Sequence, residues 1–342
     1  MWIVRLVSRR VALGVITLIA LAAAVFFIST LVPGDPARVA AGENATADQI
    51  AAARENLGLD KPVIIQFFLY LGRLLHGDLG MSISTHSPVT EGLFDALPTT
   101  FELVLMSIIL MLVVALPAAT IAALRRGGAG DQALRTSAVF TAGIPTFWLA
   151  LLVQFFIGGK LQILPLSGAV SRQYSVDRVT GFMLIDATIS GGAEAGWDAF
   201  LHLLMPSAVL AVLFGAQLFR ALRTEIIRVL AREHIAVARS KGVPPLTLVM
   251  HHVLPNSIGP AITILGVQFG MMVGSAVLVE SIFALPGLGS YLTNAVGSAD
   301  VNALLGAVLV TGLVVVTASL VVDLLQAVRD PRVRAAQNGG GR

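Results

Sequence analysis

The chain has 342 residues, of which 56% are hydrophobic and 13% are charged, and its formal net charge is +3. Soluble domains carry about a quarter charged residues, so this composition indicates an integral membrane protein. The absence of cysteine excludes disulfide frameworks, cysteine-ligated zinc, iron–sulfur clusters and thiol nucleophiles. The basic residues are scattered among apolar segments, so they indicate membrane topology before they indicate a nucleic-acid partner.

The first apolar segment predicts a transmembrane helix. Residues 11–32 form an uncharged run, which is about 33 Å long as a helix and therefore spans the hydrocarbon core. Three arginines precede this run within the first ten residues. A cleaved signal peptide is the alternative, since Ala22 to Ala24 are small, but the run is longer than a typical signal core. We interpret 1–32 as a cytoplasmic N-terminus followed by the first span.

Residues 33–97 form a polar, acid-rich segment that we expect on the external side of the membrane, with two short helices. Thr46 and Gln49 form a capping box that predicts the start of the first helix, and Gly58 predicts its end. Pro62 suits the first position of the second helix. The apolar face of this second helix consists of Ile64, Phe67, Phe68, Leu71 and Leu75. The helix either lies in the outer membrane interface or packs on the helical bundle.

Five further spans follow. Their predicted limits are 101–124, 137–157, 201–219, 260–279 and 301–322. Pro117 and Pro145 lie inside these apolar runs and predict kinks. The Gly-rich segment 158–200 predicts a second external loop. The predicted fold class is an all-α integral membrane protein of six transmembrane helices, with five of them in a core over residues 98–324.

The distribution of basic residues predicts the orientation. Sixteen of the 23 basic residues lie in four segments that fall on the same side of the membrane, and the other seven lie in the two large loops of the opposite side. The positive-inside rule therefore predicts that both termini are cytoplasmic. It also predicts that the loop 220–258 and the tail 325–342 are cytoplasmic.

Motifs of enzyme chemistry are absent from the sequence. The chain has no phosphate-cradling Gly-x-x-x-x-Gly-Lys, no His-Glu-x-x-His and no Gly-x-Ser-x-Gly. We therefore predict no catalytic residue and do not expect the chain to hydrolyse ATP or peptide bonds. His251 and His252 are adjacent, so on a helix they point about 100° apart and make a poor metal pair. We predict no metal site.

Polar residues inside the spans are candidates for a transport pathway. Three carboxylates lie within a turn or two of the predicted span ends: Glu102, Glu280 and Asp323. This position favours interfacial carboxylates over a proton relay, which needs acids near the membrane midplane. Gln154, Gln217 and Gln268 lie deeper and either hydrogen-bond between helices or line a wet passage. Without deep charges the chain lacks the usual parts of an ion-coupled transporter, so its energy must come from a partner.

A basic segment, 232–256, separates the fourth and fifth spans. Its pattern predicts a helix, a sharp turn at Gly242 with Pro244 and Pro245, and a second helix. A short rigid helix held off the membrane by this turn is suited to sit in a cleft of a soluble partner and to convert its closure into tilting of the adjacent spans. The alternative is a solvated basic loop whose charges satisfy the positive-inside rule and have no other role.

These residues resemble those of a known family. Gly242 is followed thirteen positions later by Pro255, with a leucine before the proline. This is similar to the cytoplasmic loop of ABC importer permeases, written Glu-Ala-Ala, three residues, Gly, nine residues, Ile-x-Leu-Pro. The match is partial, because Ala236 and Val237 occupy the positions of Glu and the first Ala, and His252 occupies that of Ile.

Other stretches resemble the B-type permease of bacterial dipeptide and oligopeptide importers. They occur in order along the chain, at 31–36 (LVPGDP), 57–62 (LGLDKP), 77–82 (GDLGMS), 88–89 (PV) and 283–289 (FALPGLG). The resemblance implies a type I importer of the bacterial inner membrane. Two homologous permease chains would lie side by side with two cytoplasmic ATPases, which bind ATP and magnesium, and an external binding protein would deliver the peptide. This chain itself would hold no cofactor.

The resemblance also implies roles for individual residues. The helices around Gln268 would line the passage, with Gln154 and Gln217 as further candidates. The loop that couples to the ATPase would comprise Ile235, Ala236, Val237, Ala238, Arg239, Ser240, Lys241, Gly242, Val243, Leu254 and Pro255. Nickel and glutathione importers share the same pattern, so they are alternatives for the solute. An ion-coupled secondary transporter and a membrane-embedded enzyme are the alternatives from other classes.

Overall fold

The computed structural model describes residues 2–30, 36–42, 45–56, 58–82, 84–298 and 300–329. Apart from an isolated bridge between Met81 and Pro88, every regular element in these ranges is a helix, which confirms the predicted all-α class. Outside the described residues lie most of the 31–36 stretch, the first residue of the 57–62 stretch, and 330–342 of the predicted tail.

Five helices of the described ranges are long and apolar enough to cross a membrane, and six crossings result when one bent pair counts as a single span. The five are α1 (Trp2–Ser29), α5 (Val89–Leu124), α8 (Met183–Leu230), α11 (Leu254–Phe283) and α13 (Val301–Arg329). The bent pair is α6 (Ala129–Ala142) and α7 (Thr146–Val153), the latter continued by the π-helix η1 (Gln154–Lys160). The six predicted spans are therefore present, but with different limits.

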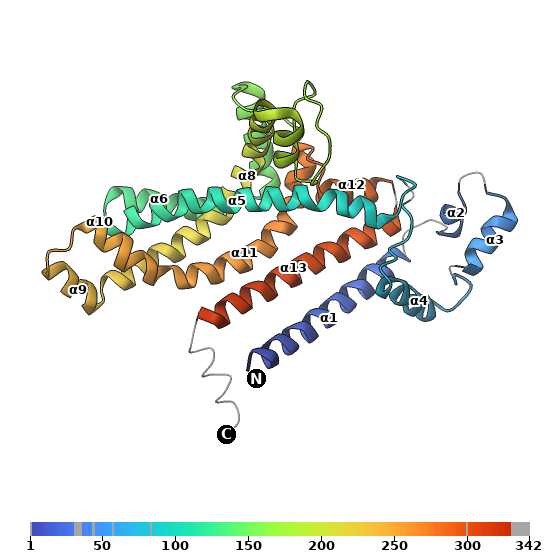
Figure 1. Ribbon diagram of the computed structural model, residues 1–342, viewed down its shortest axis with the longest axis horizontal. Coiled ribbons are helices and arrows are strands. Elements are labelled where there is room, and N and C mark those ends of the chain that lie inside the picture. The colour runs from blue at the N-terminus through green and yellow to red at the C-terminus, as the bar shows by residue number, and fades with distance from the viewer. Residues whose placement is uncertain are drawn as a thin grey trace.

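The bundle is elongated, and two short helices mark its opposite ends (Figure 1). These helices are α9 (Glu233–Ser240) and α12 (Leu288–Gly297), and we refer to the α9 end and the α12 end. α1 and α13 lie side by side, and Arg10 and Asp323 join them by an ion pair of 2.9 Å. The start of α1 therefore lies beside the later part of α13.

The predicted span 137–157 is not a continuous helix. α6 ends at Ala142 and α7 begins at Thr146, and the two are bent by 110°. Pro145 precedes α7 with an extended backbone, and proline both lacks an N–H and disfavours helical geometry in the residue before it. The kink predicted at Pro145 is therefore a complete break, whereas Pro117 lies inside the continuous α5.

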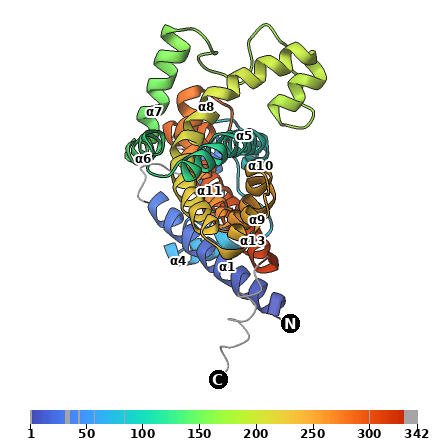
Figure 2. The ribbon, with the colours of Figure 1, turned by 90° about the vertical axis from the view of Figure 1, so that its left-hand side faces the viewer.

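α8 begins at Met183, inside the segment 158–200 that we predicted as an external loop. Its 48 residues include a break at Gly192, where φ is +81°. No side chain of the adjacent residues caps its start, but the Glu102 carboxylate accepts hydrogen bonds from the N–H groups of Met183 and Leu184 at 3.0 and 2.8 Å. A carboxylate from α5 thus satisfies the free donors at this helix end. Figure 2 shows that α7 and the first part of α8 project from the bundle.

The region between α1 and α5 has three short helices rather than the two predicted. They are α2 (Pro36–Ala41), α3 (Ala47–Asn56) and α4 (Val63–Leu75). The capping box before α3 is confirmed, because Thr46 N–H donates to Gln49 Oε1 at 2.8 Å and Gln49 N–H donates to Thr46 Oγ1 at 3.4 Å. Gly58 follows α3 with φ +66°, as predicted for its end. Pro62 caps α4 instead of occupying its first position.

The apolar residues of α4 do not form one buried face. Phe67 and Tyr70 pack on Phe26 of α1, with ring centroids 5.5 Å apart in both pairs. Three other apolar side chains of α4 are exposed in the single chain: Ile64, Phe68 and Leu75. One edge of α4 therefore packs on the bundle, while the rest of its predicted apolar face is left without a partner among the described residues.

Candidate functional site

The helix α9 is attached to the bundle by a single buried side chain. Ile235 is 1% exposed and packs in an apolar cluster with Ile226 of α8 and with Leu248 and Val253 of the π-helix η2 (Leu248–Val253). Arg232 precedes α9 with an extended backbone, and its carbonyl oxygen accepts hydrogen bonds from the first turn. α9 is thus seated on the end of α8 and on η2, which leads into α11.

The end of α9 is closed by a hydrogen-bonded cap that requires glycine. Gly242 has φ +78°, its N–H donates to the Arg239 oxygen at 3.0 Å, and Val243 N–H donates to the Ala238 oxygen at 3.3 Å. These two bonds are the pair that defines a Schellman motif. Open space surrounds the position of a Cβ at Gly242, so the glycine is needed for its left-handed backbone and not for close packing.

The outer surface of α9 mixes small, apolar and basic residues. Its exposed members are Ala236, Val237, Arg239, Ser240, Lys241 and Gly242, while Ala238 and Val243 are half-buried. Exposed Leu246, in the short helix α10 (Pro245–Thr247), and exposed Met250 continue this apolar surface. Leu254 and Pro255 begin α11, and Leu254 packs on the cluster around Ile235. The structure therefore has the predicted helix, turn and second helix.

The three glutamines form hydrogen bonds between elements. The Gln154 amide donates to the carbonyl oxygens of Leu166 and Ile282 at 3.1 and 2.9 Å. The Gln268 amide, which is buried, donates to a carbonyl oxygen of α8 at 2.8 Å and to Gln217 Oε1 at 3.4 Å. Gln217 and Gln268 thus lie together and Gln154 lies apart. These contacts favour the hydrogen-bonding alternative, and a role in lining the passage stays a prediction.

Glu280 lies within one turn of the end of α11, near the span end as expected, but its carboxylate is enclosed by the protein. It is fully buried, and its Oε2 accepts a hydrogen bond of 2.6 Å from Gly289 N–H at the start of α12. A Cβ at Gly289 would lie 2.3 Å from Val277 Cα, and one at Gly287 would lie 2.4 Å from the Glu280 carboxyl carbon. The glycines of the 283–289 stretch therefore permit α12 to approach α11 closely around a buried carboxylate.

Asp300 is a functional candidate that the sequence analysis missed. It is fully buried and accepts hydrogen bonds from Ser82 Oγ at 2.6 Å, from Ser84 N–H at 3.2 Å and from Ala303 N–H at 3.0 Å. Asp300 thus caps the start of α13 and also holds the turn that contains the 77–82 stretch. The Asp at a helix start was a usable signal, but its partner lies 218 residues away in sequence.

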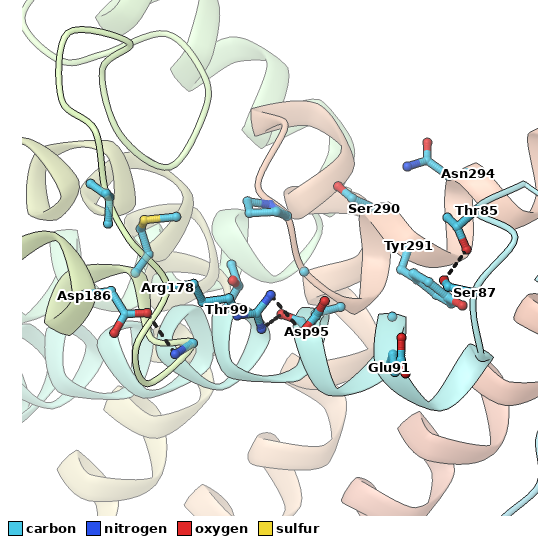
Figure 3. Close-up of a pocket in the computed structure, with 17 residues that line it drawn as sticks. Thr85, Ser87, Glu91, Asp95, Thr99, Arg178, Asp186, Ser290, Tyr291 and Asn294 are labelled. Atoms are coloured by element: carbon cyan, nitrogen blue, oxygen red, sulfur yellow. Dashed lines mark hydrogen bonds and ion pairs between the residues drawn. The ribbon is translucent and has the colours of Figure 1, made fainter. Parts of the chain in front are cut away.

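A cavity of about 420 Å³ lies at the α12 end (Figure 3). Three segments line it: the loop before α5 with the first turns of that helix, the loop before α8 with its first turn, and the loop before α12 with its first turns. Because these segments are far apart in the sequence, no local pattern could predict the cavity. Burial, together with the Asp300 carboxylate, raises the pKa of the Tyr291 phenol in its wall, which keeps that phenol neutral.

The cavity wall carries an excess of negative charge. Arg178 Nη1 forms an ion pair with Asp95 Oδ1 at 3.0 Å, and its Nη2 donates to the Asp95 carbonyl oxygen at 2.7 Å. The Asp186 carboxylate accepts hydrogen bonds from the N–H groups of Thr180 and Gly181 at 2.7 and 2.8 Å. The Glu91 carboxylate has no hydrogen-bond or ion-pair partner among the described residues. The wall therefore offers one neutralised pair, one hydrogen-bonded carboxylate and one free carboxylate.

Known protein families and individual relatives match nearly the whole length of this chain. Residues 115–335 match the family described as "Binding-protein-dependent transport system inner membrane component", and residues 3–104 match its N-terminal part. A probable D,D-dipeptide transport system permease protein of Escherichia coli is 38% identical over 92% of this chain and 92% of its own length.

Two further relatives have similar coverage. A di/tripeptide transport system permease protein of Pseudomonas aeruginosa is 34% identical over 96% of this chain and 98% of its own length. A dipeptide transport system permease protein of Escherichia coli is 33% identical with the same coverage. The chain therefore belongs to the family of binding-protein-dependent transport system inner membrane components.

Proposed function

We propose that this chain is one of two permease subunits in an ATP-driven importer of dipeptides and oligopeptides in a bacterial inner membrane. Two cytoplasmic ATPases would supply the energy, and an external binding protein would deliver the peptide. The names of the relatives support peptides as the solute, because these relatives match the chain over 92% or more of its length. The positive-inside rule supports a cytoplasmic α9 end with both termini on that side.

The main support for this proposal is the way α9 is attached to the helical bundle. Ile235 fixes the helix to α8 and η2, and the Gly242 cap gives it a rigid end, while the opposite surface of α9 is exposed. A partner that closes on this surface would push a single rigid unit. Because that unit packs on the ends of two long helices, α8 and α11, its movement tilts them together and changes access to the passage.

Substitution at Gly242 tests the coupling. In a complex reconstituted from both permeases, the ATPases and the binding protein, Gly242→Val forces a β-branched residue into a left-handed backbone. We expect this variant to assemble and to hydrolyse ATP, but to import about tenfold less peptide per ATP, since strain of about 1–2 kcal/mol at the cap displaces α9.

Gly77→Val is the matched control. Gly77 also has a positive φ, of +77°, and open space around it, and it closes its helix with the same pair of hydrogen bonds, but it ends α4, which packs on α1. If both variants lower import equally, backbone strain in general is responsible and the coupling role of α9 is wrong. If the purified chain alone accumulates peptide in vesicles under an ion gradient, a secondary transporter replaces the whole proposal.

A further inference from the structure

We propose that the cavity at the α12 end is a transit site for a short zwitterionic peptide, in which Glu91 binds the ammonium group and Arg178 binds the carboxylate. The inference rests on the proposed function, because it deepens peptide import to a contact within this chain. Figure 3 shows the two groups: Arg178 reaches Asp95, and Glu91 lies one turn nearer the start of α5.

The spacing of the two charges matches a dipeptide. Glu91 and Asp95 are four residues apart on α5, which separates them by about 6 Å along the helix axis. Arg178 is paired with Asp95, so its positive charge lies about one helical turn from the Glu91 carboxylate. An extended chain of two residues spans at most about 7 Å. The ammonium and carboxylate ends of a dipeptide can therefore reach both groups at once.

The two groups are also available to a ligand. Glu91 is exposed, and the described residues provide no partner for its carboxylate. Arg178 and Asp95 form an exposed ion pair, with side chains 46% and 65% accessible, and such pairs add little stability. A peptide carboxylate can therefore compete with Asp95 for Arg178, and repulsion between the two carboxylates limits the affinity of the site. Hydrogen bonds from Arg178 Nη2 to backbone carbonyl oxygens keep the guanidinium in place during this exchange.

The rest of the cavity suits side chains of varied size. Its volume of about 420 Å³ falls within the usual range of small-molecule sites, about 300–1,000 Å³. Its wall also includes small or neutral residues, namely Gly92, Thr99, Gly181, Ser290 and Asn294. The site therefore fixes the two termini and leaves the peptide side chains unselected.

The experiment measures peptide binding directly. The complex without its binding protein is held in nanodiscs, and saturation-transfer NMR gives the affinity for dialanine, N-acetyl-dialanine and dialanine amide. We expect Glu91→Gln to weaken dialanine binding about threefold, because a charge pair at an exposed side chain contributes little, and to leave N-acetyl-dialanine binding unchanged. Arg178→Gln is expected to lower the affinity for dialanine by a similar factor and to leave the affinity for dialanine amide unchanged.

Glu194→Gln is the matched control, since Glu194 is an exposed acid of α8 that does not line the cavity. It is expected to bind dialanine as the unaltered complex does. The transit site is overturned if Glu91→Gln and Arg178→Gln bind dialanine as tightly as the unaltered complex does, or if the unaltered complex does not bind dialanine. Failure of the proposed function is seen separately: the unaltered complex with its binding protein then imports no dialanine at all.

Discussion

Arg223 of α8 and Asp131 of α6 form a two-point ion pair across 92 residues of sequence, with an Nη2–Oδ2 distance of 2.6 Å. Asp131 Oδ2 also accepts a hydrogen bond from Gly127 N–H at 2.9 Å, so the same carboxylate holds the turn between α5 and α6. Two helices and the turn before α6 are thus joined at one acid that is 1% exposed. Such a joint is expected to hold α6 against α8.

Removing one partner of this pair should destabilise the chain. Asp131→Ala leaves the Arg223 guanidinium without its carboxylate, and an uncompensated charge in a poorly solvated position is unfavourable. We expect a lower midpoint of thermal unfolding in detergent. The double variant Asp131→Leu, Arg223→Met removes both charges and should recover part of the loss. The exposed Gln132→Ala on α6 is the control, and an Asp131→Ala midpoint equal to that of the control would contradict the joint.

Two neighbouring residues of α9 should differ sharply in their effect. Ile235→Ala opens a cavity in the cluster below α9 and should cost roughly 2–5 kcal/mol of local stability. Amide hydrogen exchange over α9 should therefore be much faster in this variant. Val237→Ala changes an exposed side chain and should alter stability by less than about 0.5 kcal/mol. Unchanged exchange in Ile235→Ala would show that Ile235 does not anchor the helix.

Two glycines of α12 form a similar contrast. Gly289→Ala places a methyl group 2.3 Å from Val277 Cα, a backbone atom that cannot turn away, so α12 must shift from α11. We expect a loss of roughly 3 kcal/mol or more, at the upper end of overpacking effects, and an altered environment of buried Glu280. Gly297→Ala has open space around it and should be neutral or stabilising by about 0.5–1 kcal/mol. Equal midpoints of thermal unfolding for the two variants would rule out this close approach.

The Asp300 carboxylate should be needed to hold the 77–82 stretch. Asp300→Ala removes the cap of α13 and the acceptor of Ser82, and we expect a loss of roughly 2 kcal/mol or more. Limited proteolysis should then cut the turn before α5 faster. Asp60→Ala, at an exposed turn before α4, is expected to leave the cutting rate unchanged. A rate in Asp300→Ala no higher than in Asp60→Ala would mean that other contacts hold the turn.

Some elements could be predicted because their stabilising contacts are local. The capping box joins Thr46 and Gln49, and the cap at Gly242 joins residues within five positions of each other, so each pattern contains all of its own partners. The apolar runs likewise showed that helices cross the membrane, because a helix satisfies its own backbone hydrogen bonds. The sequence alone thus determined the class, the approximate number of spans and the helix and turn of α9.

The remaining features depend on partners that are far away in sequence. Glu102 caps α8 from 81 residues away, so the residue that satisfies the donors of Met183 and Leu184 cannot be identified from a local pattern. The ion pair between α6 and α8 also joins segments that are far apart in sequence. The same is true of the cavity that contains Glu91 and Arg178. A carboxylate near the end of an apolar run has the same sequence pattern whether it faces lipid headgroups or is buried in the protein, as Glu280 is. Only the tertiary structure decided between these, because the free energy of a buried charge depends on the donors that folding brings to it.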